Sequence, residues 1–170
     1  MTQTGERAAY GPRVFALSED DLPTAAPRQM GPNCMSYLQE VVDSGLTSNM
    51  IQRFEEAFAR EMGVKHCIAT PGCPPALSVL AAAFDFEPGD EIIVSSVTDF
   101  GTVHGLIKEN FIPVFADTEP GTINISAATI EPCISARTRA ILVVHMTGLI
   151  CDMDPILELA ARHDLVVYED

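Results

Sequence analysis

Two patterns of apolar and polar positions follow each other along the chain. From Asn33 to Gly45 the apolar residues recur at helical spacing, which predicts a first helix with Asn33 as its N-cap and Gly45 at its end. A second helix is predicted over about 49–62 and ends at Gly63. Its apolar face consists of Ile51, Phe54, Phe58 and Met62.

Beyond Gly63 short apolar runs alternate with helical patterns. The apolar runs, which predict strands, lie at 65–70, 91–95, 113–117, 139–145 and 165–169. The helical patterns between them lie at about 75–86, 100–110, 126–134 and 153–163. This alternation predicts an α/β fold of three layers (αβα), with a mainly parallel sheet covered by helices on both faces.

The predicted topology also indicates where a ligand would bind. Ligands of such sheets bind beyond the carboxyl ends of the strands. That rule brings four segments to one edge of the sheet, namely 70–75, 95–100, 145–148 and Asp170. The topology predicts a site there without naming a reaction.

Residues 1–31 differ from the rest of the chain. They contain several glycines and prolines and little periodicity, so we expect a flexible N-terminal arm. The folded domain is expected over 32–170.

Composition and charge exclude several classes of partner. Hydrophobic residues make up 47% and charged residues 20% of the chain, as in soluble globular proteins. The net charge of -14 disfavours nucleic acids and anionic membranes as partners. No apolar run is long enough to span a membrane and no secretory signal is present, so a cytoplasmic protein is expected.

The cysteines and histidines do not predict a metal site. The five cysteines form no CxxC pair, which is typical of reduced thiols. His66, His104 and His163 have no convincing partners for metal binding, even with Cys67 or Cys73.

Four segments carry a more specific signal. The first segment combines 44–45 (SG) with 54–59 (FEEAFA), and the second is 88–94 (PGDEIIV). The third combines 113–117 (PVFAD) with 124–125 (NI). The fourth begins at 138–141 (TRAI), continues through His145, Gly148 and 152–154 (DMD), and ends at 168–170 (YED). In this order and spacing, over 33–170, they resemble the DegT/DnrJ/EryC1/StrS family of pyridoxal-phosphate (PLP) aminotransferases. Each segment alone is a weak signal.

The resemblance implies a fold and an activity. It implies the N-terminal portion of the PLP-binding large domain of a fold-type I enzyme, without the C-terminal remainder. The implied reaction transfers an amino group from an amino acid to a keto-sugar, often nucleotide-linked, or to a keto-cyclitol. A branch of the family that uses PLP for sugar dehydration stays open. As partners, the resemblance implies a second copy of the chain or a complementing C-terminal part.

The resemblance also assigns roles to residues. Asp170 matches the family's acid that pairs with the ring nitrogen of PLP. Gly72, Cys73 and Pro74 match the turn that holds the phosphate at the start of a helix. Pro74 and Pro75 replace a threonine and a small residue of that turn, which removes one hydroxyl and two N–H donors.

Three further positions belong to the predicted cofactor site. Asp99 occupies the position of the family's usual ring-stacking aromatic residue, with Phe100 beside it. Phe100 is interpreted either as a substitute for that aromatic residue or as a core residue. His145 ends a strand on the same edge, either as a hydrogen-bonded structural residue or as an acid–base group.

The family's Schiff-base lysine has no counterpart in the chain. The only lysines are Lys65 and Lys108, and neither matches its position. The chain by itself is therefore predicted not to transaminate. Two alternatives stay open: a non-catalytic homologue that acts as a partner subunit, and a free-standing flavodoxin-like ligand module.

Overall fold

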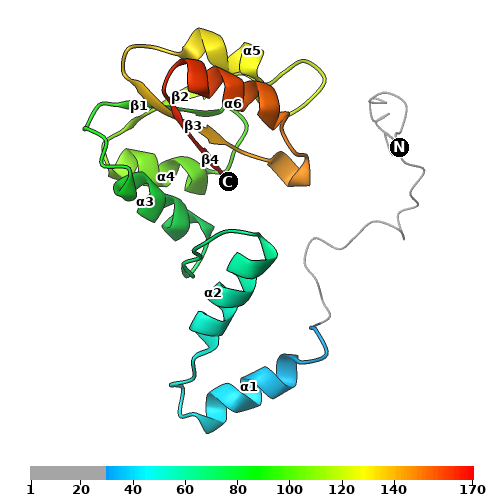
Figure 1. The fold of residues 1–170 in the computed structure, drawn as a ribbon. Helices are drawn as coiled ribbons and strands as arrows, with labels where there is room; N and C mark the ends of the chain where they lie inside the picture. The colour runs from blue at the N-terminus through cyan, green and yellow to red at the C-terminus, as the bar shows by residue number, and fades with distance from the viewer. Residues whose placement is uncertain (1–29) are drawn as a thin grey trace, which may run out of the picture. The chain divides into compact units, whose positions relative to one another are not determined.

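The computed structural model of the protein describes residues 30–170 and divides the chain into two units, 1–57 and 58–170. Figure 1 shows the helices and strands of both units. Apart from Met30 and Gly31, the predicted N-terminal arm lies outside the described residues and stays a prediction.

The first unit consists of α1 (Cys34–Asp43) and most of α2 (Met50–Glu61), as the apolar spacing predicts. Asn33 precedes α1, and beyond the helix Gly45 adopts a left-handed backbone with φ of 66°. The guanidinium of Arg53 donates to Glu40 at 2.7 Å and lies 5.5 Å from the ring centre of Tyr37. These contacts link the two helices within the unit.

The second unit contains a parallel sheet with the strand order β2-β1-β3-β4. The strands are β1 (Glu91–Ser95), β2 (Ile112–Ala116), β3 (Thr138–Val143) and β4 (Val166–Glu169). β1 and β3 are the central strands, and nearly all of their residues are buried, as expected for strands covered on both faces.

Helices cover both faces of this sheet (Figure 1). On one face α3 (Cys73–Ala83) and α4 (Phe100–Lys108) share an apolar cluster with Ile92, Val94 and Leu142. On the other face α5 (Ala127–Ile130), the 3-10 turn Glu131–Cys133 and α6 (Met153–Arg162) pack on Ile93 and Ile141. Alternate residues of β1 thus enter opposite cores, and the predicted three-layer α/β fold is confirmed.

The strand predicted at 65–70 is wrong, because this segment has no strand structure. A strand exists only through pairing with a neighbour, and the sheet runs from β2 to β4 without this segment. Ile68 is 75% exposed, so the apolar run does not enter either core.

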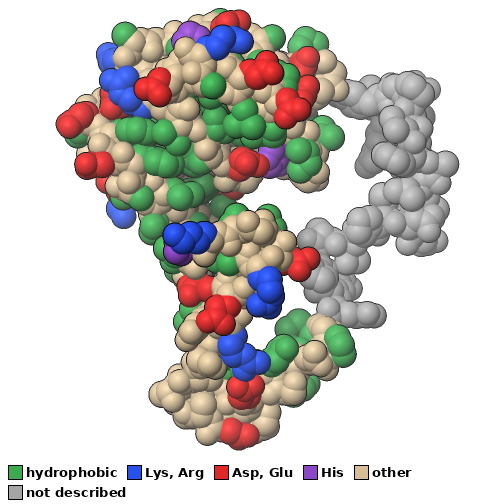
Figure 2. Space-filling view, in the orientation of Figure 1, with side chains coloured by type: hydrophobic (Ala, Val, Ile, Leu, Met, Phe, Trp, Pro, Cys, Tyr) green, Lys and Arg blue, Asp and Glu red, His purple; other side chains and the backbone are tan. Residues whose placement is uncertain are grey.

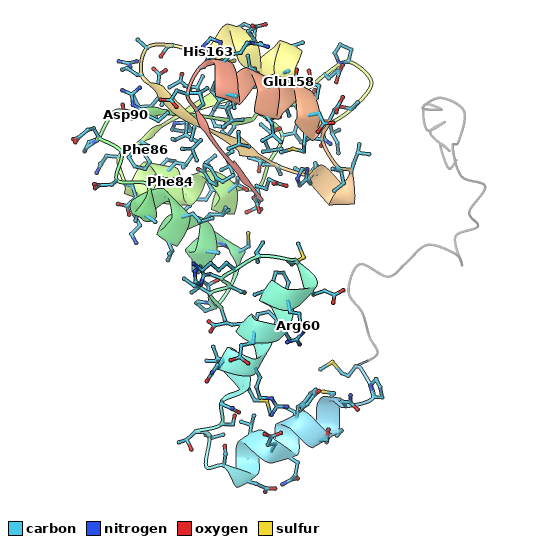
Figure 3. The ribbon with its side chains drawn as sticks, in the orientation of Figure 1. Arg60, Phe84, Phe86, Asp90, Glu158 and His163 are labelled. Carbon is cyan, nitrogen blue, oxygen red and sulfur yellow. The ribbon has the colours of Figure 1, made fainter. Side chains whose placement is uncertain are left out.

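An aromatic cluster ties α3 to β4. Phe84 and Phe86 lie in the connection between α3 and β1 (Figure 3). The ring of Phe84 is 5.1 Å from that of Tyr168, and the ring of Phe86 is 6.0 Å from that of Phe111. Tyr168 lies two residues before Asp170, so this packing fixes the end of β4 relative to α3.

Acidic side chains are spread over the visible surface of the second unit (Figure 2), in keeping with the net charge of -14. Over residues 30–170 no helix combines the length and the hydropathy that a membrane crossing requires.

Candidate functional site

The strand order creates a switch point at the carboxyl ends of β1 and β3. From β1 the chain adds β2 on one side, and it then crosses over to place β3 and β4 on the other. Ligands of open α/β sheets bind at such a point. The segments that leave the strands here begin after Ser95, Val143 and Glu169.

Asp170 is the junction of these segments. Its backbone N–H donates to the carbonyl of Val143 at 2.8 Å, and its own carbonyl accepts from the N–H of His145 at 3.2 Å. Its carboxylate receives two donors. Oδ2 accepts from the hydroxyl of Thr102 at 2.6 Å, and Oδ1 accepts from the thiol of Cys73 at 3.1 Å.

Thr102 belongs to a relay of hydroxyl groups. It lies on α4, is 4% exposed, and accepts a hydrogen bond from the hydroxyl of Thr98 at 2.8 Å. Thr98 therefore orients Thr102, which in turn holds the Asp170 carboxylate. Neither threonine was predicted as a site residue from the sequence, although two threonines four residues apart at a helix start share one side of that turn.

Cys73 joins the α3 turn to Asp170. It is the first residue of α3, and the predicted meeting of the 72–75 turn with Asp170 is confirmed by the 3.1 Å contact. The hydrogen bond to Asp170, with smaller contributions from burial and from the Asp170 charge, raises the pKa of Cys73 to about 11. At neutral pH the residue is a thiol that donates, not a reactive thiolate.

The first turn of α3 offers few donors to an anion. Pro74 and Pro75 have no N–H group, and the N–H of Ala76 donates to the carbonyl of Gly72 at 3.2 Å. The N–H of Cys73 is the one donor of that turn which the helix itself does not use. Gly72 serves as the N-cap, with an extended backbone that other residues also adopt.

Asp99 and Phe100 begin α4. The side chain of Asp99 caps the helix by accepting from the N–H of Gly101 at 2.7 Å. Phe100 is 68% exposed and its ring lies edge-on to His104 at 5.9 Å. The interpretation of Phe100 as a core residue is therefore wrong, and a stacking role stays a prediction.

His145 is held from two sides. Its Nδ1 accepts from the N–H of Cys151 at 3.2 Å, and its Nε2 lies 2.7 Å from Oε2 of Glu169. Because Nδ1 is an acceptor, Nε2 carries the hydrogen and donates to Glu169. This geometry suits a residue that links the ends of β3 and β4. Glu169, its partner, was not predicted from the sequence.

Neither lysine bonds to the Asp170 carboxylate or to Cys73. Lys108 ends α4, six residues beyond Thr102, which is about 9 Å along the helix axis. Within residues 30–170 no group of three His, Cys, Asp or Glu side chains is arranged to hold a metal ion.

The sequence profile of the DegT/DnrJ/EryC1/StrS aminotransferase family matches residues 28–170. The chain belongs to this family. It is 44% identical over 156 residues to the GDP-perosamine synthase of Caulobacter vibrioides, a match that covers 88% of the chain and 42% of that relative.

Solved structures of the family have the same fold. The aminotransferase from Psychrobacter cryohalolentis superposes with a TM-score of 0.80 at 31% identity, covering 87% of this chain and 38% of that one. The E. coli GDP-4-keto-6-deoxy-D-mannose-3-dehydratase with bound hydrated PLP gives a TM-score of 0.79 at 25% identity, covering 85% and 39%. The chain thus spans about two-fifths of the length of the relatives it matches.

Proposed function

We propose that this chain holds the ring of PLP in an aminotransferase that transfers an amino group from an amino acid to a keto-sugar, often nucleotide-linked, or to a keto-cyclitol. The observation that carries the proposal is the Asp170 junction. A carboxylate at the carboxyl end of β4 is held by Thr102 and Cys73 at the switch point of the sheet. Membership of the family supplies the reaction class.

The geometry of Asp170 fits the ring of PLP. Each carboxylate oxygen has two acceptor positions, and Thr102 and Cys73 occupy one on each oxygen. An acceptor position is left for the N–H of a pyridinium ring. When bound, PLP supplies an electron sink for the amino donor, and the negative charge of Asp170 keeps the ring nitrogen protonated. In the proposal Asp99, Phe100 and His145 border this ring.

The α3 turn would hold the phosphate of PLP less firmly than a turn in which every residue has an N–H group. The N–H of Cys73 and the dipole of an 11-residue helix favour an anion there. The two prolines remove donors that such a turn otherwise presents. We therefore propose that much of the phosphate affinity comes from groups outside this turn.

The complete reaction requires a lysine that this chain does not place beside Asp170. We propose that a complementing C-terminal part, made of residues outside these 170, supplies this lysine, and that the assembly is a homo-oligomer or forms with that part. The five free cysteines are consistent with a cytoplasmic location for that assembly.

Two observations favour a second function. A homologue that has lost PLP and serves as a partner subunit has no need for an anion-binding turn. The turn at 72–75 has a single unused N–H donor, and Asp99 caps a helix where the family usually has an aromatic residue.

Titration with PLP separates the two functions. We expect the wild-type chain to bind PLP and to change its absorbance spectrum. Asp170→Asn is expected to weaken binding about ten- to hundredfold, because a hydrogen bond to a charged group contributes roughly 1.5–3 kcal/mol. Asp164→Asn is the matched control. It precedes β4 at the opposite end of the strand and has a left-handed backbone that asparagine tolerates.

Each result has a clear meaning. Equal affinity of the wild type and of Asp170→Asn would contradict the assignment of Asp170. An absence of binding by the wild type at millimolar PLP would favour the partner-subunit function instead.

A further inference from the structure

Gly101 on α4 lies directly against Pro74 on α3. A Cβ atom at position 101 would be 2.8 Å from Cγ of Pro74 and 3.4 Å from its Cβ. It would also be 2.9 Å from Oδ1 of Asp99. The φ of Gly101 is not in the left-handed region, so space and not backbone conformation demands glycine here.

A second close contact follows one helical turn along. A Cβ atom at Gly105 would be 2.9 Å from Cα and 3.0 Å from the backbone nitrogen of Ser78. The hydroxyl of Ser78 donates to the carbonyl of Pro74 at 3.0 Å. Gly101 and Gly105, one turn apart on α4, thus face Pro74 and Ser78, one turn apart on α3, so the two helices approach each other closely along this turn.

This contact lies beside the Asp170 junction. Cys73 precedes Pro74 and donates to Oδ1 of Asp170, while Thr102 follows Gly101 and donates to Oδ2. The two residues that touch are therefore the immediate neighbours of the two donors that hold the carboxylate.

We infer that Pro74 and Gly101 are a matched pair of positioning residues that holds the Cys73 thiol on the Asp170 carboxylate. The contact fixes the spacing between the anion-binding end of α3 and the acid at the end of β4. That this spacing matters for PLP binding rests on the proposed function. The contact between Pro74 and Gly101 and its effect on Cys73 do not rest on it.

The reactivity of Cys73 reports this spacing without any cofactor. The hydrogen bond to Asp170, together with smaller effects of burial and of the Asp170 charge, raises the pKa of Cys73 to about 11 from an ordinary value of 9.0. If Cys73 moves away from Asp170, all three effects weaken, and the thiolate fraction at pH 8 rises by up to about 100-fold. The less basic thiolate is also less nucleophilic, which reduces the gain in rate roughly tenfold. Alkylation by iodoacetamide should therefore become about tenfold faster.

The experiment is a double-mutant cycle on the 170-residue chain. A Cys67→Ser background leaves Cys73 as the only thiol in the tryptic peptide 66–108, whose alkylation is followed by mass spectrometry. Gly101→Ala should accelerate alkylation of Cys73 about tenfold, because the new methyl group displaces Pro74. Adding Pro74→Ala removes Cγ, and the rate should return to within about twofold of Pro74→Ala alone.

Gly105→Ala is the control for a general disturbance of the helix pair. Its Cβ meets the backbone of Ser78, so Pro74→Ala should not restore its alkylation rate. Any loss of the Asp99 cap in Gly101→Ala would persist when Pro74→Ala is added, so it cannot explain the return of the alkylation rate.

The outcomes that overturn the inference are specific. One is a folded Gly101→Ala protein in which Cys73 is alkylated no faster than in the wild type. Another is a Pro74→Ala, Gly101→Ala double mutant in which Cys73 reacts as fast as in Gly101→Ala alone. If Gly101→Ala does not fold, Gly101→Ala combined with Pro74→Ala should fold, because the clash with Cγ of Pro74 is removed. Failure of both proteins to fold contradicts the inference. A failed PLP titration would refute the proposed function and leave the alkylation result standing.

Discussion

Replacement of Thr102 by valine tests whether the hydroxyl relay holds the Asp170 carboxylate. Valine has nearly the same shape as threonine but replaces the hydroxyl with a methyl group. The change removes the donor that lies 2.6 Å from Oδ2 of Asp170 and the acceptor that lies 2.8 Å from the hydroxyl of Thr98. Thr102 is 4% exposed, so water does not readily replace it.

The expected cost follows from these contacts. A hydrogen bond to a charged group contributes about 1.5–3 kcal/mol, and the partly exposed Thr98 hydroxyl adds less than about 1 kcal/mol. Thr102→Ser keeps the hydroxyl and loses one buried methyl group, at a cost of about 1 kcal/mol. With an m-value of about 2 kcal/mol/M, Thr102→Val should lower the urea midpoint by about 0.8–2 M, and Thr102→Ser by about 0.5 M.

Urea unfolding of four proteins isolates the pairwise interaction. The wild type, Thr102→Val, Asp170→Asn and the double mutant form a cycle whose coupling energy should be about 1–3 kcal/mol. A Thr102→Val protein that is no less stable than Thr102→Ser, or a coupling energy of zero with Asp170→Asn, would show that the Thr102 hydroxyl does not hold the carboxylate.

Two further predictions concern stability away from the site. The carboxyl of Glu91 has its pKa held below the usual value, mainly by the hydrogen bond from the Ser135 hydroxyl and then by that from the Arg137 guanidinium. Glu91→Gln should therefore lower stability at pH 7. The difference in urea midpoint between the wild type and Glu91→Gln should decline as the pH falls below about 4.3 and vanish below the lowered pKa of Glu91. A wild-type midpoint that is still higher at pH 2 would contradict this. Tyr168 is buried, its hydroxyl has no partner among the described residues, and burial raises its pKa, so Tyr168→Phe should raise stability by up to about 1 kcal/mol. Tyr37→Phe on the half-exposed α1 ring should change little, and a greater loss of stability in Tyr168→Phe than in this control would contradict the prediction.

Elements with a strong local signal were predictable from the sequence. The run 91–95 between two turn segments forms β1 with the predicted bounds, because both of its faces are buried. β2 is one residue earlier than predicted, and α3 starts at Cys73 instead of about 75, since prolines are accepted in the first turn of a helix.

Features that depend on distant partners were not predictable in the same way. The 65–70 run has β-type residues but gains no neighbouring strand. The meeting of Cys73 with Asp170, 97 residues apart, followed from topology and family resemblance. The role of Thr102 did not, because a helical pattern does not show which polar residue faces a carboxylate 68 residues away.

Glycine and capping positions show the same limit. Gly101 gives no sign in the sequence that a proline ring fills the space beside it. Asp99 was predicted only as a residue of the cofactor site, and its capping of α4 was not predicted.

The central claim is that Asp170 is the partner of the ring nitrogen of bound PLP. The most direct test is the ¹⁵N chemical shift of PLP labelled at the ring nitrogen, at saturation with the wild-type chain and with Asp170→Asn. We expect the chemical shift of a protonated, hydrogen-bonded pyridinium in the wild type and its loss in Asp170→Asn. A ring nitrogen with the same shift in both proteins would contradict it.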